Sequence, residues 1–128
     1  MRRQATLDGT PGTAATARTL TADLLTHAAA TGHPLTDRTR ETALLVVSEL
    51  VTNATRHAPG PCRLDLTLTD QHLHITVEDT HPALPAPRTH DAARIGGHGL
   101  EIVLALCTRL HTETTPHGKR LHAHLPLT

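Results

Sequence analysis

Residues 63–78 contain two runs in which apolar and polar residues alternate, and no other part of the sequence limits the possible folds as strongly. Successive side chains of a β-strand point to opposite faces of a sheet, so each run predicts a strand with one buried face and one face in water. A tight turn at Asp70-Gln71 joins the two runs, which predicts a β-hairpin. The residues expected on the buried face are Leu64, Leu66, Leu68, Leu73, Ile75 and Val77.

Helical spacing of apolar residues occurs in three further segments of the chain. Thr36 has the side chain of a good N-cap for the second of these helices. A second hairpin is expected to turn at residues 116–119. The sequence therefore predicts an α+β fold in one domain, residues 1–128, in which helices cover one face of a mostly antiparallel sheet in a two-layer sandwich. The expected helices cover residues 13–30, 37–57 and 100–110, and the other expected strands are residues 4–7 and a closing strand that buries Leu121, Ala123 and Leu125.

The composition argues against several classes of function. The chain has 128 residues, no Phe, Tyr or Trp, and 12 Lys and Arg against 12 Asp and Glu. It therefore lacks both the aromatic stacking surfaces and the net positive charge that nucleic-acid-binding proteins use. No apolar run approaches the roughly 20 residues that a membrane span needs, and the N-terminus has no apolar signal core. We expect a cytoplasmic protein that contacts neither nucleic acid nor membrane.

The two cysteines, Cys62 and Cys107, are far apart in the sequence and fit no metal-ligand spacing. They could form a disulfide, but two buried thiols in a reducing cytosol are the simpler interpretation.

Polar residues mark one edge of the expected helix at residues 37–57. Glu49 and Asn53 are four residues apart, and His57 continues the same row one turn later. From spacing alone, these residues are either the boundary of an amphipathic helix or polar groups of a site beside the core. The apolar arc next to them contains Ala43, Val46, Val47, Leu50, Val51 and Ala54.

Asp79 ends the second alternating run with the same parity as Val77, so its side chain is expected on the helix-covered side of the sheet, opposite to that of Glu78. A buried carboxylate without a donor would cost several kcal/mol. The donor is either a backbone amide of the following loop or the amino group of a bound ligand.

The residues Gly97-His98-Gly99-Leu100 begin the third expected helix. Exposed N–H groups at a helix start favour an anion, and glycine lets a phosphate approach the backbone. A simple loop-to-helix turn explains the same residues equally directly.

These three features occur together in a known order. Glu-Leu-Val-Thr-Asn-Ala at residues 49–54, followed by Arg56-His57-Ala58, resembles the N-box of the GHKL ATPases, the superfamily of gyrase, heat-shock chaperone, histidine kinase and mismatch-repair ATPases with the Bergerat fold. Asp79 looks like the first glycine box of that superfamily, and residues 97–100 look like the second. The small size of the chain and the amino-acid sequence of its N-box are similar to those of bacterial anti-sigma-factor serine/threonine kinases. The resemblance covers residues 4–125.

The resemblance implies a binding site for ATP and Mg²⁺. In it, Glu49 would be the catalytic acidic residue, whose carboxylate acts as general base or orients the attacking hydroxyl, and Asn53 would coordinate Mg²⁺. Asp79 would accept a hydrogen bond from the adenine amino group. The remaining nucleotide contacts would come from His57, Gly97, His98, Gly99 and Leu100, beneath a lid formed by residues 82–95.

The resemblance also implies partners. Members of this family phosphorylate a serine on an anti-anti-sigma protein of the STAS type, otherwise bind a sigma factor, and are commonly homodimers. The chain departs from the pattern at residues 80–83, Thr-His-Pro-Ala, where glycines usually follow the aspartate. The alternative is therefore an ATP-binding regulatory module without phosphotransfer.

Histidines are abundant on the polar sides of the expected strands. His72 and His74 share a face, as do His122 and His124. If their strands are neighbours, four imidazoles could converge on a metal ion, whereas a solvated outer face of the sheet is the simpler explanation.

Overall fold

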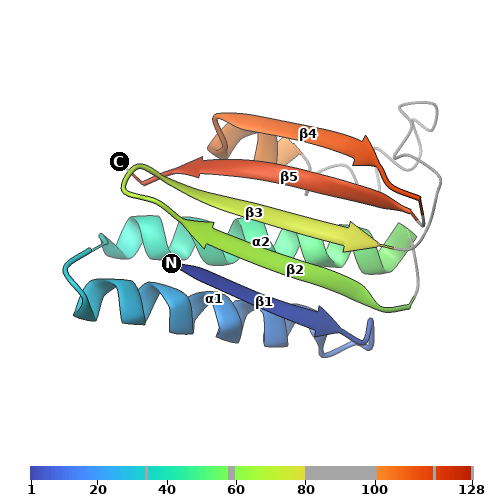
Figure 1. The fold of residues 1–128 in the computed structure, drawn as a ribbon, viewed down its shortest axis with the longest axis horizontal. Coiled ribbons are helices and arrows are strands. Elements are labelled where there is room, and N and C mark those ends of the chain that lie inside the picture. The colour runs from blue at the N-terminus through green and yellow to red at the C-terminus, as the bar shows by residue number, and fades with distance from the viewer. Residues whose placement is uncertain (34, 58–59, 80–100, 117, 128) are drawn as a thin grey trace.

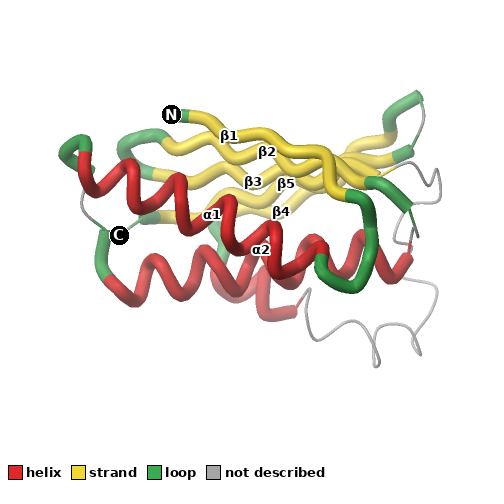
Figure 2. Tube along the Cα trace, turned by 90° about the horizontal axis from the view of Figure 1, so that it is seen from below, coloured by secondary structure: helices red, strands yellow, loops and turns green. Residues whose placement is uncertain are grey.

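The structure is a computed structural model that describes residues 1–128 except 34, 58–59, 80–100, 117 and 128. One antiparallel sheet has the strand order β1-β2-β3-β5-β4, and the two long helices lie side by side on one of its faces (Figures 1 and 2). This arrangement confirms the predicted α+β sandwich. The elements are β1 (Arg2–Leu7), α1 (Thr13–Ala30), α2 (Asp37–His57), β2 (Cys62–Leu68), β3 (His72–Asp79), β4 (Arg109–Thr114) and β5 (Lys119–Pro126), with a short helix at residues 101–106.

The register of the central strands explains the position of the core. Ile75 of β3 lies opposite Leu66 of β2 on one side and Ala123 of β5 on the other, and all three are fully buried. Because the side chains alternate, every second residue of these strands faces the helices. The six residues of the predicted hairpin core are all buried, which confirms that prediction.

Helix α2 follows its sequence signals closely. The Thr36 hydroxyl accepts a hydrogen bond from the Thr39 backbone N–H at 3.1 Å, so Thr36 caps the helix as predicted. All six residues of the predicted apolar arc are buried against the core. The polar margin of α2 is therefore held in a fixed orientation beside the sheet.

The third helix is shorter than predicted. Its predicted start, Leu100, lies outside the described residues, and the helix ends at Leu106 rather than at Leu110. Arg109 begins β4, and the Thr108 backbone N–H donates a hydrogen bond to the His124 carbonyl at 2.9 Å. Pairing with β5 supplies the backbone hydrogen bonds that a last helical turn would have made, and it places Leu110 opposite Ala123.

Both cysteines are free thiols, as expected, but only Cys62 is fully buried, and Cys107 is partly buried. Burial raises the pKa of Cys107 to about 11. Burial, followed by the nearby Asp79 carboxylate, also raises the pKa of Cys62, so neither group is a reactive thiolate near neutral pH. Among the described helices, none is both long and apolar enough to cross a membrane.

Candidate functional site

The polar margin of α2 lies where the sequence predicts. Asn53 is buried, with 7% of its surface exposed, although it is an amide next to an apolar arc. Glu49, one turn earlier, is partly exposed. His57 is the last residue of α2, and its side chain is outside the described part of the structure.

Asp79 is the last residue of β3, and its side chain is only 4% exposed. The alternation of β3 turns it toward the helices, whereas Glu78 faces the other way, where it accepts a hydrogen bond from Arg120. This confirms the predicted orientation of both carboxylates.

Asp79 has a side-chain partner that was not predicted from the sequence. The Lys119 Nζ lies 2.7 Å from the Asp79 Oδ2, and the Lys119 side chain is 6% exposed. The register of β3 and β5 places these two residues directly opposite each other. The signal was present in the sequence, because Lys119 has the same parity as Leu121 and therefore faces the core.

The end of β3 and the end of α2 lie at the same side of the molecule, where β5 begins (Figure 1). Helix α2 packs against β2 and β3, so its last turns lie beside the end of the sheet. Asn53 is one turn before the end of α2, and Asp79 and Lys119 are at the adjoining strand ends. The fold thus gathers a buried amide, a buried carboxylate and a buried ammonium group at one end of the core.

The residues expected to bind phosphate belong to one segment of the chain. Gly97, His98, Gly99 and Leu100, together with the expected lid at residues 82–95, lie outside the described residues.

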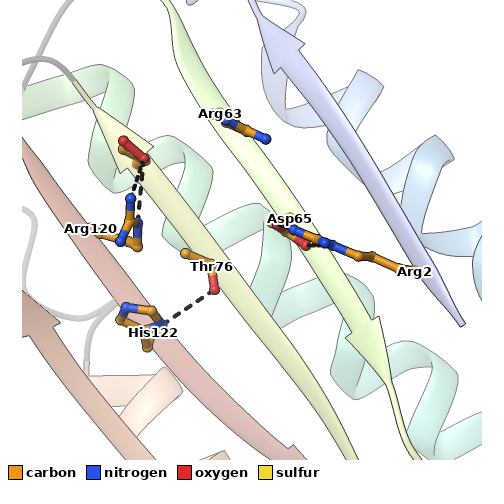
Figure 3. A pocket seen from close by; sticks show the side chains of 7 residues that line it. Arg2, Arg63, Asp65, Thr76, Arg120 and His122 are labelled. Carbon is orange, nitrogen blue, oxygen red and sulfur yellow. Dashed lines mark hydrogen bonds and ion pairs between the residues drawn. The ribbon is translucent and has the colours of Figure 1, made fainter.

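The opposite face of the sheet has a hollow of about 280 Å³, shown in Figure 3. Four of its five charged side chains form two ion pairs: Arg2 contacts Asp65 at 2.6 Å, and Arg120 contacts Glu78 at 3.0 Å. The surface of the hollow therefore carries both positive and negative charges rather than charges of one sign. It is lined by Arg2, Arg63, Asp65, Thr76, Glu78, Arg120 and His122.

Four histidines cluster beside this hollow. His74 stacks on His124 with ring centroids 4.3 Å apart, and His111 stacks on His122 at 4.5 Å. The predicted set contained His72 instead of His111. His72 lies opposite Pro126 at the end of the β3–β5 pairing. His111 was not considered, because the bounds of β4 had not been predicted. In the part of the chain that the structure describes, no three His, Cys, Asp or Glu residues are arranged to hold a metal ion. The metal interpretation of these histidines is therefore not supported.

The histidine cluster predicts an acid-sensitive fold. Burial and then the neighbouring imidazoles lower the pKa of His74, His111 and His124. Between these lowered values and the ordinary value of about 6.5, the unfolded chain binds more protons than the folded one. Stability is therefore complete above about pH 6.5 and falls as the pH decreases toward 5. Urea denaturation at pH 7.5 and 5.5 measures this change.

A matched pair of variants identifies the groups responsible. Replacing His111 and His124 together with Gln is expected to reduce the difference in unfolding free energy between pH 7.5 and 5.5. His27 lies on the exposed side of α1, outside the cluster, so His27→Gln is expected to leave that difference unchanged. An equal pH dependence in the double variant and the wild type would contradict the account.

The two-layer sandwich of one antiparallel sheet covered by helices is consistent with a GHKL-type ATPase fold. Residues 10–124 match the family model described as the histidine kinase-like ATPase domain. The match covers most of the chain, which therefore belongs to the histidine kinase-like ATPase family, and membership in this family implies ATP binding. No curated protein matches the sequence significantly.

Proposed function

We propose that this chain is an ATP-dependent serine/threonine protein kinase that regulates transcription. It phosphorylates an anti-anti-sigma partner of the STAS type and otherwise sequesters a sigma factor, acting in the cytoplasm as a homodimer. Family membership supports the ATP-binding part of this proposal. The form of the N-box at residues 49–54 supports the kinase type.

The observation that carries the proposal is the buried Asp79 carboxylate on the helix side of the sheet, at the end of the core where α2 also ends. A carboxylate in this position can accept a hydrogen bond from the amino group of an adenine. The nucleotide would then extend along the last turns of α2, toward Asn53 and Glu49.

The residues of α2 fit the chemistry of a magnesium–nucleotide site. Amide oxygens are hard donors of the kind that Mg²⁺ accepts, and Asn53 supplies one of them. When bound, Mg²⁺ would neutralise the charge on the phosphates. His57, Gly97, His98, Gly99 and Leu100 would supply the remaining phosphate contacts.

In the transfer step, the partner's serine oxygen would bond to the γ-phosphorus as the bond from that phosphorus to the bridging oxygen breaks. ADP would leave with the bridging oxygen. The Glu49 carboxylate would orient the serine hydroxyl and accept its proton.

The substitution Asn53→Ala is expected to weaken ATP binding in the presence of magnesium by roughly tenfold or more, because the metal loses a ligand and a buried polar contact. Binding without magnesium should change much less. Isothermal titration with ATP, with and without Mg²⁺, measures both values. Thr52→Ala on the same helix is the control, and equal magnesium dependence in wild type and Asn53→Ala would count against the assignment of Asn53.

The second candidate is a regulator that binds ATP without transferring phosphate. The residues that follow Asp79, Thr-His-Pro-Ala at 80–83, favour it because they replace the glycines of the family pattern. Radiolabelled ATP with Mg²⁺ and a STAS-type domain separates the two candidates. Transfer to a serine or threonine supports the kinase, whereas ATP binding without transfer supports the regulator.

A further inference from the structure

Lys119 is a buried cation that has no role in the function proposed above. Among the residues that the structure describes, Asp79 and Lys119 are the only charged side chains classed as buried. The next residues of β5 on the same face, Leu121 and Ala123, are apolar. Lys119 therefore interrupts the apolar face of β5 at a position where a Leu or Val would continue it.

Stability alone does not explain this pair. Moving two charges out of water costs free energy that their mutual attraction only partly recovers, and apolar replacements of similar volume are often equally stable or more so. A retained buried ion pair at the end of the core therefore suggests that both groups have a ligand to contact. The proposed adenine contact of Asp79 accounts for only one of the two.

The pair offers an acceptor and a donor side by side. The Asp79 Oδ2 and the Lys119 Nζ are 2.7 Å apart. An ammonium group has three N–H donors and a carboxylate can accept several hydrogen bonds, so groups of these two kinds can contact each other and a ligand at the same time. The edge of adenine presents the complementary arrangement, an amino donor next to the ring nitrogen N1, which is an acceptor.

We infer that Lys119 is a second base-selecting residue of the nucleotide site, whose ammonium group donates a hydrogen bond to adenine N1 while Asp79 accepts one from the adenine amino group. This inference rests on the proposed function, because it requires the base to lie at Asp79. Both contacts lie in a buried environment, where hydrogen bonds to charged groups are stronger than in water.

Nucleotide analogues test the two contacts separately by isothermal titration of the full chain with Mg²⁺. The analogue 1-deaza-ATP has C–H in place of N1 and keeps the amino group. It is expected to bind the wild type roughly tenfold or more weakly than ATP. Purine riboside triphosphate keeps N1 but lacks the amino group, and it reports on Asp79.

In Lys119→Met, the ratio of the 1-deaza-ATP and ATP dissociation constants is expected to fall to about three or less, because the donor to N1 is gone. The penalty for purine riboside triphosphate should remain in this variant and disappear in Asp79→Leu, whose side chain has no acceptor. Arg120→Met is the control: Arg120 is the adjacent cation on the opposite face of β5, and its removal should leave the 1-deaza penalty intact.

The outcomes separate this inference from the proposed function. If the wild type binds ATP and 1-deaza-ATP equally well, Lys119 does not contact the base, while the nucleotide site stands. The same conclusion follows if Lys119→Met retains the full 1-deaza penalty. A wild type that binds no ATP overturns both proposals. Should Lys119→Met fail to fold, the double variant Asp79→Asn/Lys119→Met replaces it, and a 1-deaza penalty as large as that of the wild type would exclude Lys119 as the donor to N1.

Discussion

Replacing Glu49 with Gln is expected to slow phosphoryl transfer to a STAS-type partner by roughly 10²–10⁴-fold, the range for loss of a general base. Glutamine has nearly the same shape but cannot accept the proton of the attacking hydroxyl. Glu49 is partly exposed at the margin of α2, so the substitution leaves no cavity in the core and the fold should persist. ATP affinity should stay near the wild-type value, because Asn53 and Asp79 are unchanged.

The measurement is transfer of radiolabelled phosphate to the partner at saturating ATP, with ATP binding measured separately by titration. Glu41→Gln is the matched control, since Glu41 lies on the same helix two turns earlier and is exposed. Wild-type transfer by Glu49→Gln would remove Glu49 from the mechanism.

Removing the Lys119 ammonium alone is expected to cost about 3–5 kcal/mol of unfolding free energy, because Asp79 would then be a buried charge without its ion-pair partner. Such a loss is a large part of the roughly 5–15 kcal/mol by which ordinary domains are stable. Urea denaturation of Lys119→Met against wild type measures it.

Two controls separate the charge from the packing. The double variant Asp79→Asn/Lys119→Met removes both charges and should recover most of the lost stability. Arg120→Met removes a cation that is more than one-third exposed, and its effect should be about 1 kcal/mol or less. If Lys119→Met is as stable as Arg120→Met, the Asp79–Lys119 ion pair contributes little to the free energy of unfolding.

The fold was largely predictable because its signals are local. Alternation fixed which face of β2 and β3 is buried, and it placed Asp79 on the helix side. The helical spacing of α2 likewise identified its buried arc and the margin that carries Glu49 and Asn53. Each of these features depends only on residues that are near one another in the sequence.

Two features escaped prediction for different reasons. Lys119 meets Asp79 only because β5 lies next to β3, which is distant in the sequence. His111 was missed because the third helix was expected to continue to Leu110, over the first residues of β4 in the second hairpin. The pairing of β4 with β5 ends the third helix before Leu110. Strand order is set by how the whole chain packs, so periodicity within one segment could not supply it.

We expect a nucleotide to bind at the end of the core formed by α2 and the adjoining ends of β3 and β5. A two-dimensional ¹H–¹⁵N NMR titration of the labelled chain with ATP and Mg²⁺ tests this directly. The largest amide shifts are expected in residues 49–57, at Asp79 and at Lys119, with little change at His74 and His124 on the opposite face. Shifts confined to that opposite face, or none at saturating ATP, would contradict the account.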